Sequence, residues 1–201
     1  MKRTVTIYIA DANCISLDQI DSLSFLNKKD KEEIFKYIPD ETKKEKAISR
    51  YFLNKYIKNY TISNDGKPVS EDKYFNISHS FGKVVFALSS ANIGIDIEKI
   101  RDAEPNLIDY VSNEEEQKYI DGDSTKFFEI WTSKESLVKC IGTGLENDLK
   151  NVSGLPINGE KRCKTQLFFV KSLKFEDFVI SITLEGNEDF EISFVEEKFE
   201  F

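Results

Sequence analysis

The segment IGIDIE, residues 93–98, restricts the fold more than any other part of this sequence. Successive side chains of a strand point to opposite faces, so a strand here buries its three isoleucines on one face. Asp96 and Glu98 then share the other face, about 7 Å apart along the strand. Two carboxylates at this spacing can bind one hard cation. The alternative is an edge strand whose polar face is simply solvated.

Hydrophobic periodicity divides the rest of the chain into alternating strands and helices. A period of two predicts strands at residues 4–9, 74–77, 84–89, 93–98, 167–170, 178–184 and 190–195. Helical spacing predicts helices at residues 29–37, 40–60, 113–119 and 125–141. Ser112 with Glu115 three residues later indicates the start of the third helix, and Gly142 indicates the end of the fourth. The pattern predicts an α+β protein, as a single unit or as two closely docked lobes.

Composition excludes several classes of protein. The 201 residues can bury a core without disulfides. A formal net charge of -8 argues against a general nucleic-acid binder. No apolar run approaches the roughly 20 residues that span a bilayer, and the first residues lack the apolar core of a signal peptide. Three cysteines without CxxC spacing argue against a disulfide framework and against a zinc site. We therefore expect a cytoplasmic protein that binds neither nucleic acid nor membrane.

The segment WTSKESLVK, residues 131–139, contributes a third carboxylate. On a helix, Glu135 lies along the same stripe as Trp131 and Val138, at the edge of an apolar face that should point into the protein. Burying an unpaired carboxylate is costly. Glu135 is satisfied if it joins the two carboxylates of the IGIDIE strand around Mg²⁺. The alternative is an exposed ion pair with Lys139, one turn later on the helix.

The segment FNISHS, residues 75–80, holds the only histidine of the chain. His79 lies between two serines at the end of a predicted strand, a setting suited to hydrogen bonding with phosphate. A structural histidine is the alternative interpretation. Lys67, followed by Pro68, adds a cation on a rigid turn just upstream. The sequence contains neither a Walker-type loop nor a GxGxxG motif, so nucleotide-binding folds of those types are not supported.

Together, four motifs resemble the ordered motif set of the 4'-phosphopantetheinyl transferase superfamily, in particular its larger monomeric, surfactin-synthetase-activating type. The motifs are GKP (66–68), FNISHS (75–80), GIDIE (94–98) and WTSKESLVKCIGTGL (131–145). The resemblance implies an α+β fold of two similar α/β lobes related by a pseudo-twofold axis. We expect an N-terminal lobe at residues 1–90 and a C-terminal lobe with the metal-binding motifs at residues 91–201. Coenzyme A would bind in the cleft between them.

The resemblance also implies roles for individual residues. The expected ligands of Mg²⁺ are Asp96, Glu98 and Glu135. The residues expected to contact the phosphates of coenzyme A are Lys67, Ser78, His79 and Lys139, with Pro68 beside them. Arg50 matches a basic position near the 3'-phosphate, and Glu115 falls near an acidic position about twenty residues after GIDIE. The lysine pair of the family's early helix does not align cleanly; the candidates are Lys28, Lys29 and Lys31, of which we take Lys31 as the cofactor-binding choice.

The implied activity is the Mg²⁺-dependent transfer of 4'-phosphopantetheine from coenzyme A to a serine of an acyl or peptidyl carrier protein, with release of 3',5'-ADP. Serine hydroxyls need a general base, for which Glu135, directly or through a metal-bound water, is the first choice and Glu115 the second. Lys139, Lys67 and protonated His79 would stabilise the phosphates by charge-assisted hydrogen bonds.

The resemblance suggests a monomer that serves secondary-metabolite synthases, although fatty-acid, polyketide and nonribosomal-peptide carriers all remain open. Candidate carrier-docking segments lie after Asp102 and at residues 113–120. Two alternatives use the same residues differently. One is a Mg²⁺-dependent hydrolase that cleaves a pyrophosphate with water, and the other is a non-catalytic paralogue that only binds carrier proteins.

Overall fold

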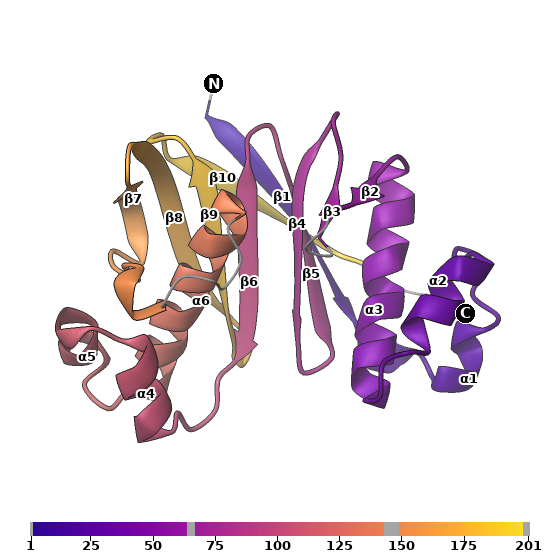
Figure 1. Ribbon diagram of the computed structural model, residues 1–201, viewed down its shortest axis with the longest axis horizontal. Helices are drawn as coiled ribbons and strands as arrows, with labels where there is room; N and C mark the ends of the chain where they lie inside the picture. The colour runs from indigo at the N-terminus through magenta and orange to yellow at the C-terminus, as the bar shows by residue number, and fades with distance from the viewer. Residues whose placement is uncertain (1, 64–66, 143–148, 199–201) are drawn as a thin grey trace.

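The computed structural model describes residues 2–63, 67–142 and 149–198, and it shows two four-stranded sheets with helices outside them (Figure 1). The first sheet has the order β10 (Phe190–Glu196), β1 (Arg3–Asp11), β5 (Lys83–Ser89) and β4 (Tyr74–Ser80). The second has the order β6 (Ile93–Lys99), β9 (Phe178–Glu185), β8 (Gln166–Phe175) and β7 (Asn158–Cys163). The strands β2 (Thr61–Ile62) and β3 (Pro68–Val69) form a separate two-stranded ribbon. The architecture is mixed α+β, as the sequence predicts.

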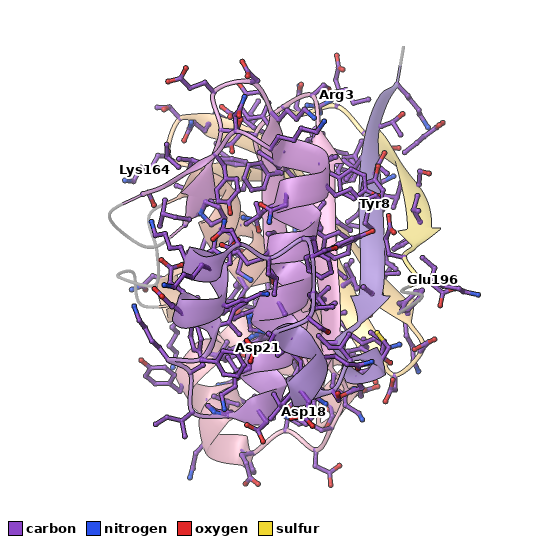
Figure 2. All side chains as sticks on the ribbon, turned by 90° about the vertical axis from the view of Figure 1, so that its right-hand side faces the viewer. Arg3, Tyr8, Asp18, Asp21, Lys164 and Glu196 are labelled. Atoms are coloured by element: carbon purple, nitrogen blue, oxygen red, sulfur yellow. The ribbon has the colours of Figure 1, made fainter. Side chains whose placement is uncertain are left out.

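The helices form two groups, one for each large sheet. The first group comprises α1 (Leu17–Ile20), α2 (Lys28–Ile34) and α3 (Asp40–Phe52), and a π-helical turn over Leu53–Ile57 continues α3. The second group comprises α4 (Pro105–Val111), α5 (Glu114–Ile120) and α6 (Ser124–Ile141). Figure 2 views the molecule from the side of the first group, whose helices lie in front of the first sheet. No helix among the described residues is both long and apolar enough to cross a membrane.

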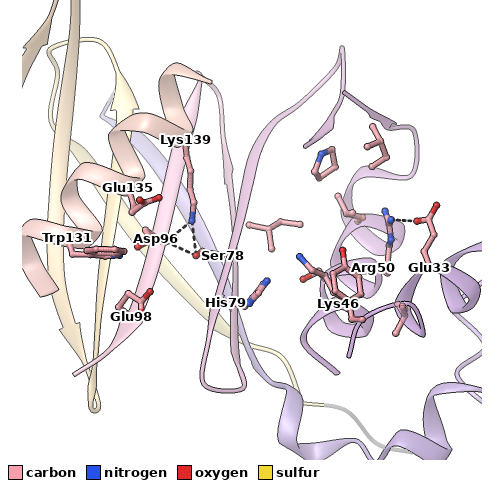
Figure 3. Close-up of a pocket in the computed structure, with 17 residues that line it drawn as sticks. Glu33, Lys46, Arg50, Ser78, His79, Asp96, Glu98, Trp131, Glu135 and Lys139 are labelled. Atoms are coloured by element: carbon pink, nitrogen blue, oxygen red, sulfur yellow. Dashed lines mark hydrogen bonds and ion pairs between the residues drawn. The ribbon is translucent and has the colours of Figure 1, made fainter. Parts of the chain in front are cut away.

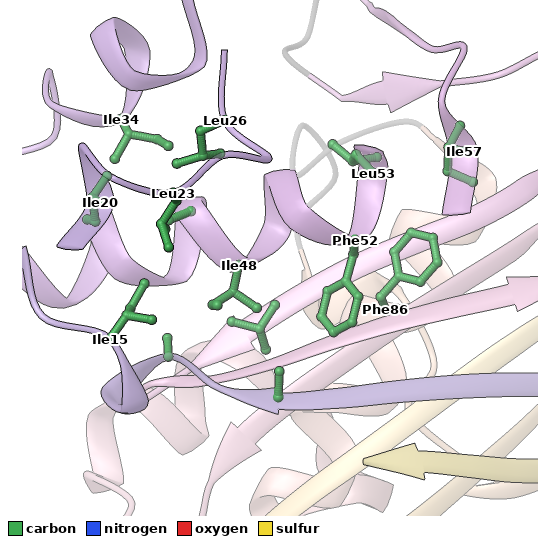
Figure 4. Packing of buried hydrophobic residues seen from close by; sticks show 14 of the residues in the cluster. Ile15, Ile20, Leu23, Leu26, Ile34, Ile48, Phe52, Leu53, Ile57 and Phe86 are labelled. Carbon is green, nitrogen blue, oxygen red and sulfur yellow. The ribbon is translucent and has the colours of Figure 1, made fainter. Parts of the chain in front are cut away.

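Three apolar layers hold these elements together, because each strand of the two sheets presents alternate residues to opposite sides. Between the sheets, the isoleucines of β6 pack against Val5, Ile7 and Ile9 of β1. Outside the first sheet, α3 packs on β5 through contacts such as that of Phe52 with Phe86, whose rings stack 5.4 Å apart (Figure 4). Outside the second sheet, α6 covers β6, β8 and β9. The molecule therefore has four layers: helices, sheet, sheet and helices.

The strand β10 links the two ends of the chain. It leaves the second sheet after β9 and pairs in parallel with β1, so that Arg3 lies opposite Phe190 and Ile9 opposite Glu196. The segment expected as the C-terminal lobe, residues 91–201, therefore contributes one strand to the sheet that residues 3–89 otherwise form.

The predicted elements are all present, with corrections at their ends. The helix expected at residues 40–60 ends as an α-helix at Phe52. Asn113, not Ser112, caps the helix expected at residues 113–119: its side chain accepts the backbone N–H groups of Glu115 and Glu116. Gly142 ends α6 in the left-handed conformation, with φ 80°. The sequence did not predict α1, α4, β7 or the ribbon of β2 and β3.

Candidate functional site

A cavity of about 520 Å³ lies between α3 and α6, over the edges of β4 and β6 (Figure 3). The polar residues that line it are Glu33, Lys46, Ser49, Arg50, Ser78, His79, Asp96, Glu98, Glu135 and Lys139. The apolar and aromatic lining residues are Ile34, Tyr37, Leu53, Ile62, Pro68, Ile77 and Trp131. Most residues that the sequence singles out are thus brought together, from five separate elements. The motif residues 66 and 143–145 lie outside the described residues.

The position of α6 depends on a glycine in β6. A Cβ atom on Gly94 would lie 1.9 Å from the Ser136 carbonyl oxygen and 2.5 Å from the Cys140 backbone nitrogen. Only a residue without a side chain allows the backbone of α6 to approach β6 this closely. The approach brings Glu135 and Lys139 of α6 over Asp96, as Figure 3 shows.

Asp96 is the central residue of the site. Its Oδ1 atom accepts hydrogen bonds from the Ser78 hydroxyl at 2.8 Å and from the Lys139 ammonium at 2.6 Å. Its Oδ2 atom is buried and has no hydrogen-bond partner among the described residues. A buried carboxylate oxygen without a partner is costly. The structure therefore leaves one ligand position of Asp96 unused, at the wall of a cavity.

Two further carboxylates face the same end of the cavity. Glu98 accepts hydrogen bonds from the Ser80 hydroxyl at 2.9 Å and from Arg101 at 3.2 Å, and burial together with the charge of Asp96 raises its pKa. Burial and Asp96 also raise the pKa of Glu135 to about 7, although Lys139 opposes the shift. The acidic groups disfavour one another's charged forms, so this end of the cavity holds more negative charge than its surroundings balance.

These carboxylates fit a hard divalent cation in their chemistry. Oxygen ligands with water and phosphate oxygens in the remaining positions are what Mg²⁺ prefers. The unpartnered Oδ2 atom of Asp96 supplies one such ligand. The described residues do not, however, contain a ready-made group of three or more His, Cys, Asp or Glu side chains arranged to hold a metal ion. A cation here would thus depend on oxygen ligands from a substrate or water, in addition to Asp96, Glu98 and Glu135.

Cationic and hydroxyl groups lie next to the carboxylates. The Lys67 ammonium donates to the Lys139 carbonyl oxygen at 2.8 Å, and burial lowers the pKa of Lys67. His79 lines the cavity, and its Nδ1 atom lies 2.9 Å from Oε2 of Glu45. The other oxygen of Glu45 accepts the Gly82 backbone N–H at 2.9 Å, which fixes the carboxylate in place. The imidazole is therefore oriented by a buried carboxylate on α3.

The opposite wall of the cavity comes from α2 and α3. Arg50 donates to Glu33 at 2.7 Å and lies 3.4 Å from Asp30, so its guanidinium is held by two carboxylates. Lys46 lines the same wall 5.6 Å from the Tyr37 ring centroid, and burial lowers its pKa. The sequence did not single out Lys46, because the packing of α3 against the sheet decides which of its lysines faces the cavity.

Three expected residues do not line the cavity: Lys31, Glu115 and Lys67, whose ammonium donates to the Lys139 carbonyl oxygen. Lys31 is tied to the Asp21 carbonyl oxygen and does not line the cavity. Glu115 is exposed in the first turn of α5 and also lies outside the cavity lining. Its neighbour Glu116 is the buried acidic residue of this segment, because the helix begins one residue later than the sequence predicts. Lys28 forms an exposed pair with Glu32, at 3.8 Å.

A buried ionic network supports α6 from behind the cavity. Lys134 is fully buried, and its ammonium lies 2.6 Å from Oε2 of Glu116. The same carboxylate accepts the backbone N–H groups of Asn113 and Gly154. Lys161 of β7 donates to the Ser133 hydroxyl at 2.7 Å, and burial lowers the pKa of Lys161 to about 7. The network fixes α5, α6 and the segment before β7 in one arrangement.

Comparison with known proteins gives the family. The family model of the 4'-phosphopantetheinyl transferase superfamily matches residues 92–195, just over half of the chain. The chain belongs to this superfamily. The match includes β6 and α6, the elements that carry the three carboxylates and Lys139.

Curated relatives agree with this assignment. A 4'-phosphopantetheinyl transferase named gsp from Aneurinibacillus migulanus is 41% identical over 86 residues, which are 40% of this chain and 36% of the relative. A 4'-phosphopantetheinyl transferase from Bacillus subtilis is 33% identical over 118 residues, 53% of this chain and 51% of the relative. The 4'-phosphopantetheinyl transferase Sfp from Bacillus subtilis (strain 168) is 34% identical over 116 residues, 53% and 52%. The matches thus span about half the length of these relatives, or less.

Proposed function

We propose that the chain transfers 4'-phosphopantetheine from coenzyme A to a serine of an acyl or peptidyl carrier protein in the presence of Mg²⁺, with release of 3',5'-ADP. The observation that carries the proposal is the buried Oδ2 atom of Asp96, which has no partner in the part of the chain that the structure describes, on the wall of a cavity with Glu98, Glu135 and Lys139. The relatives that the chain matches bear the name of this transferase activity.

Each group has a distinct task in the proposed reaction. Asp96, Glu98 and Glu135 hold Mg²⁺, which, when bound, offsets negative charge on the pyrophosphate. Lys139 reaches over the Asp96 carboxylate and donates to the same phosphates, as does Lys67, the residue before β3. The Ser78 hydroxyl and the His79 imidazole complete the phosphate contacts from β4.

Proton transfer from the carrier serine requires a base within reach of the reacting phosphate. Glu135 is the base in this proposal, because it lines the cavity beside the other two carboxylates. Glu115, the second choice from the sequence, is exposed and outside the cavity lining. The serine oxygen attacks the β-phosphorus, the bond to the bridging oxygen breaks, and the serine proton passes to Glu135.

The proposal also includes the arrangement of the two lobes, the docking surface for the carrier protein and the state of the protein in the cell. The two groups of helix and sheet correspond to the two similar lobes implied by the family, related by a pseudo-twofold axis, with the donor between them. The carrier protein docks on the segment after Asp102 and on residues 113–120. The first of these segments includes Tyr110 of α4, an exposed aromatic side chain. The protein acts as a cytoplasmic monomer on carriers of secondary-metabolite synthases.

Intact-mass spectrometry of apo carrier proteins tests the proposal. Carriers of the fatty-acid, polyketide and nonribosomal-peptide types are incubated with the protein, coenzyme A and Mg²⁺. We expect one carrier or more to gain one phosphopantetheine, and the gain to be lost with Asp96→Asn or with a chelator. Asp177→Asn is the matched control, because Asp177 is exposed and pairs with Lys99 outside the cavity. Consumption of coenzyme A without a mass gain would indicate a hydrolase instead.

A further inference from the structure

On the wall of the cavity that faces α6, the positive charge of Arg50 is balanced by carboxylates of the protein itself. Arg50 uses one terminal nitrogen for Glu33 at 2.7 Å and the other for the Tyr60 hydroxyl at 3.2 Å. Its Nε atom lies 3.4 Å from Oδ1 of Asp30, whose side chain is only 7% exposed. All three guanidinium nitrogens therefore already have partners. Figure 3 shows the Glu33–Arg50 pair on the side of the cavity away from the carboxylates of β6.

The charges at this wall cancel. Lys46 and Arg50 supply two positive charges, and Asp30 and Glu33 supply two negative ones. A phosphate dianion beside Arg50 would have to approach the Glu33 carboxylate or displace it from the guanidinium. Like charges at such distances repel, and Arg50, whose side chain is 18% exposed, is also held by the buried Asp30 carboxylate, so a phosphate would compete with two carboxylates for one guanidinium. The wall is thus suited to an uncharged group that donates hydrogen bonds, rather than to a second phosphate.

The apolar surroundings favour a nucleoside in this position. Ile34, Tyr37 and Leu53 line the same wall. In the transfer, the pantetheine arm leaves with the carrier protein, so the arm must extend toward solvent. The nucleoside half is the leaving group and stays inside until transfer is complete. With the pyrophosphate at the carboxylate end of the cavity, the ribose then lies toward Glu33, whose carboxylate can accept from ribose hydroxyls.

We propose that this enzyme is built to accept a donor whose ribose 3'-position is an unesterified hydroxyl, so that 3'-dephospho-coenzyme A serves about as well as coenzyme A and Glu33 sets this specificity. This inference rests on the proposed function and concerns its donor. The balance of the transfer is unchanged: the serine oxygen bonds to the β-phosphorus, the bridging oxygen leaves with the electron pair, and the serine proton goes to Glu135. The leaving group is then adenosine 5'-monophosphate.

The first test compares the two donors in the carrier mass assay with the wild-type protein. A charge-assisted contact to a 3'-phosphate would favour coenzyme A by roughly 10-fold or more in kcat/KM. We expect a preference for coenzyme A below about 5-fold or a preference for the dephospho donor. A larger preference for coenzyme A would overturn the inference and leave the proposed function intact. If neither donor modifies any carrier, it is the proposed function that fails.

The second test changes the wall itself. Glu33→Gln removes one negative charge and frees the guanidinium, so the ratio of kcat/KM for coenzyme A to that for the dephospho donor should rise by roughly 10-fold. Glu32→Gln is the control, because Glu32 is on the same helix, is exposed, and pairs with Lys28 away from the cavity. An unchanged ratio in Glu33→Gln would show that Glu33 does not set the specificity.

Calorimetry provides a readout that needs neither turnover nor a carrier. Adenosine 3',5'-bisphosphate and adenosine 5'-monophosphate differ only in the 3'-phosphate. With the wild-type protein we expect their dissociation constants to agree within about 5-fold, whereas Glu33→Gln should bind the bisphosphate roughly 10-fold more tightly than the monophosphate. Tighter binding of the bisphosphate to the wild-type protein by more than that margin would contradict the inference. This comparison also stands if the variant is too unstable for kinetics.

Discussion

The substitution Glu116→Gln should lower the free energy of unfolding far more than the neighbouring substitution Glu115→Gln. Glu116 lies against the buried Lys134 ammonium at 2.6 Å, and it also accepts the Gly154 backbone N–H at 2.6 Å. A glutamine keeps one oxygen and places an amide donor where the second oxygen accepted. The buried Lys134 ammonium then loses its ion pair with Glu116.

The expected loss follows from these contacts. Breaking a buried ion pair by removal of one partner costs about 3–5 kcal/mol. Loss of the backbone acceptor falls within the same range, because such effects are not additive within one network. For a chain of this size the loss corresponds to a decrease of about 6–20 °C in Tm, at about 2–4 °C per kcal/mol. Glu115→Gln changes only an exposed charge near a helix N-terminus, worth less than about 1 kcal/mol.

Urea unfolding monitored by the fluorescence of Trp131, the only tryptophan of the chain, measures both variants. A double variant, Glu116→Gln with Lys134→Met, should recover part of the loss, because it also removes the buried charge that Glu116 balanced. The reasoning is refuted if Glu116→Gln loses less than about 1 kcal/mol, or if the double variant is less stable than the sum of the single changes predicts.

Three further outcomes are expected. Gly94→Ala should lower the free energy of unfolding in urea by roughly 3 kcal/mol or more, because the new Cβ atom meets the α6 backbone at 1.9 Å. Gly142→Ala is the control: its Cβ atom meets no atom within 4 Å, so it should cost only about 1 kcal/mol from its positive φ. In chelator, wild-type stability relative to Glu135→Gln should fall as pH rises from about 4.5 to 7, since the raised pKa of about 7 lets the folded state hold a proton that the unfolded state releases. Solvent screening limits the stability difference above pH 7 to about 1–2 kcal/mol. A difference that does not change with pH would contradict the raised pKa of Glu135. Wild-type stability relative to Lys161→Met should rise between pH 7 and about 10, because the pKa of about 7 makes the folded state release a proton that the unfolded state retains. Parallel pH profiles of the two proteins would contradict the lowered pKa of Lys161.

The sequence predicts the strands around the site well, because their pattern is local. The alternation in β6 places Ile95 and Asp96 on opposite faces, and the structure shows Ile95 in the core between the sheets and Asp96 at the cavity. Helix α6 is equally clear, since its apolar stripe and Gly142 mark its face and its end. The α+β class follows from these patterns alone.

The pairing of side chains from different elements could not be predicted from the sequence pattern. Lys139 pairs with Asp96 of another element and not with the carboxylate one turn earlier on its own helix, because the approach of α6 to β6 decides which partner is nearer. The pairing of Arg50 with Glu33 and Asp30 likewise depends on how α2 packs against α3. Glu116 was missed by one position, since Asn113 and not Ser112 caps the helix.

The parallel pairing of β10 with β1 has a consequence for how the chain acquires its structure. During synthesis, β1 leaves the ribosome first, but one of its edges stays open until residues 190–196 have emerged. Contacts between such distant segments form late and slow the folding of a chain. An unpaired strand edge is also a template for association with other chains. Truncation before β10 should therefore harm solubility through β1, at the opposite end of the sequence.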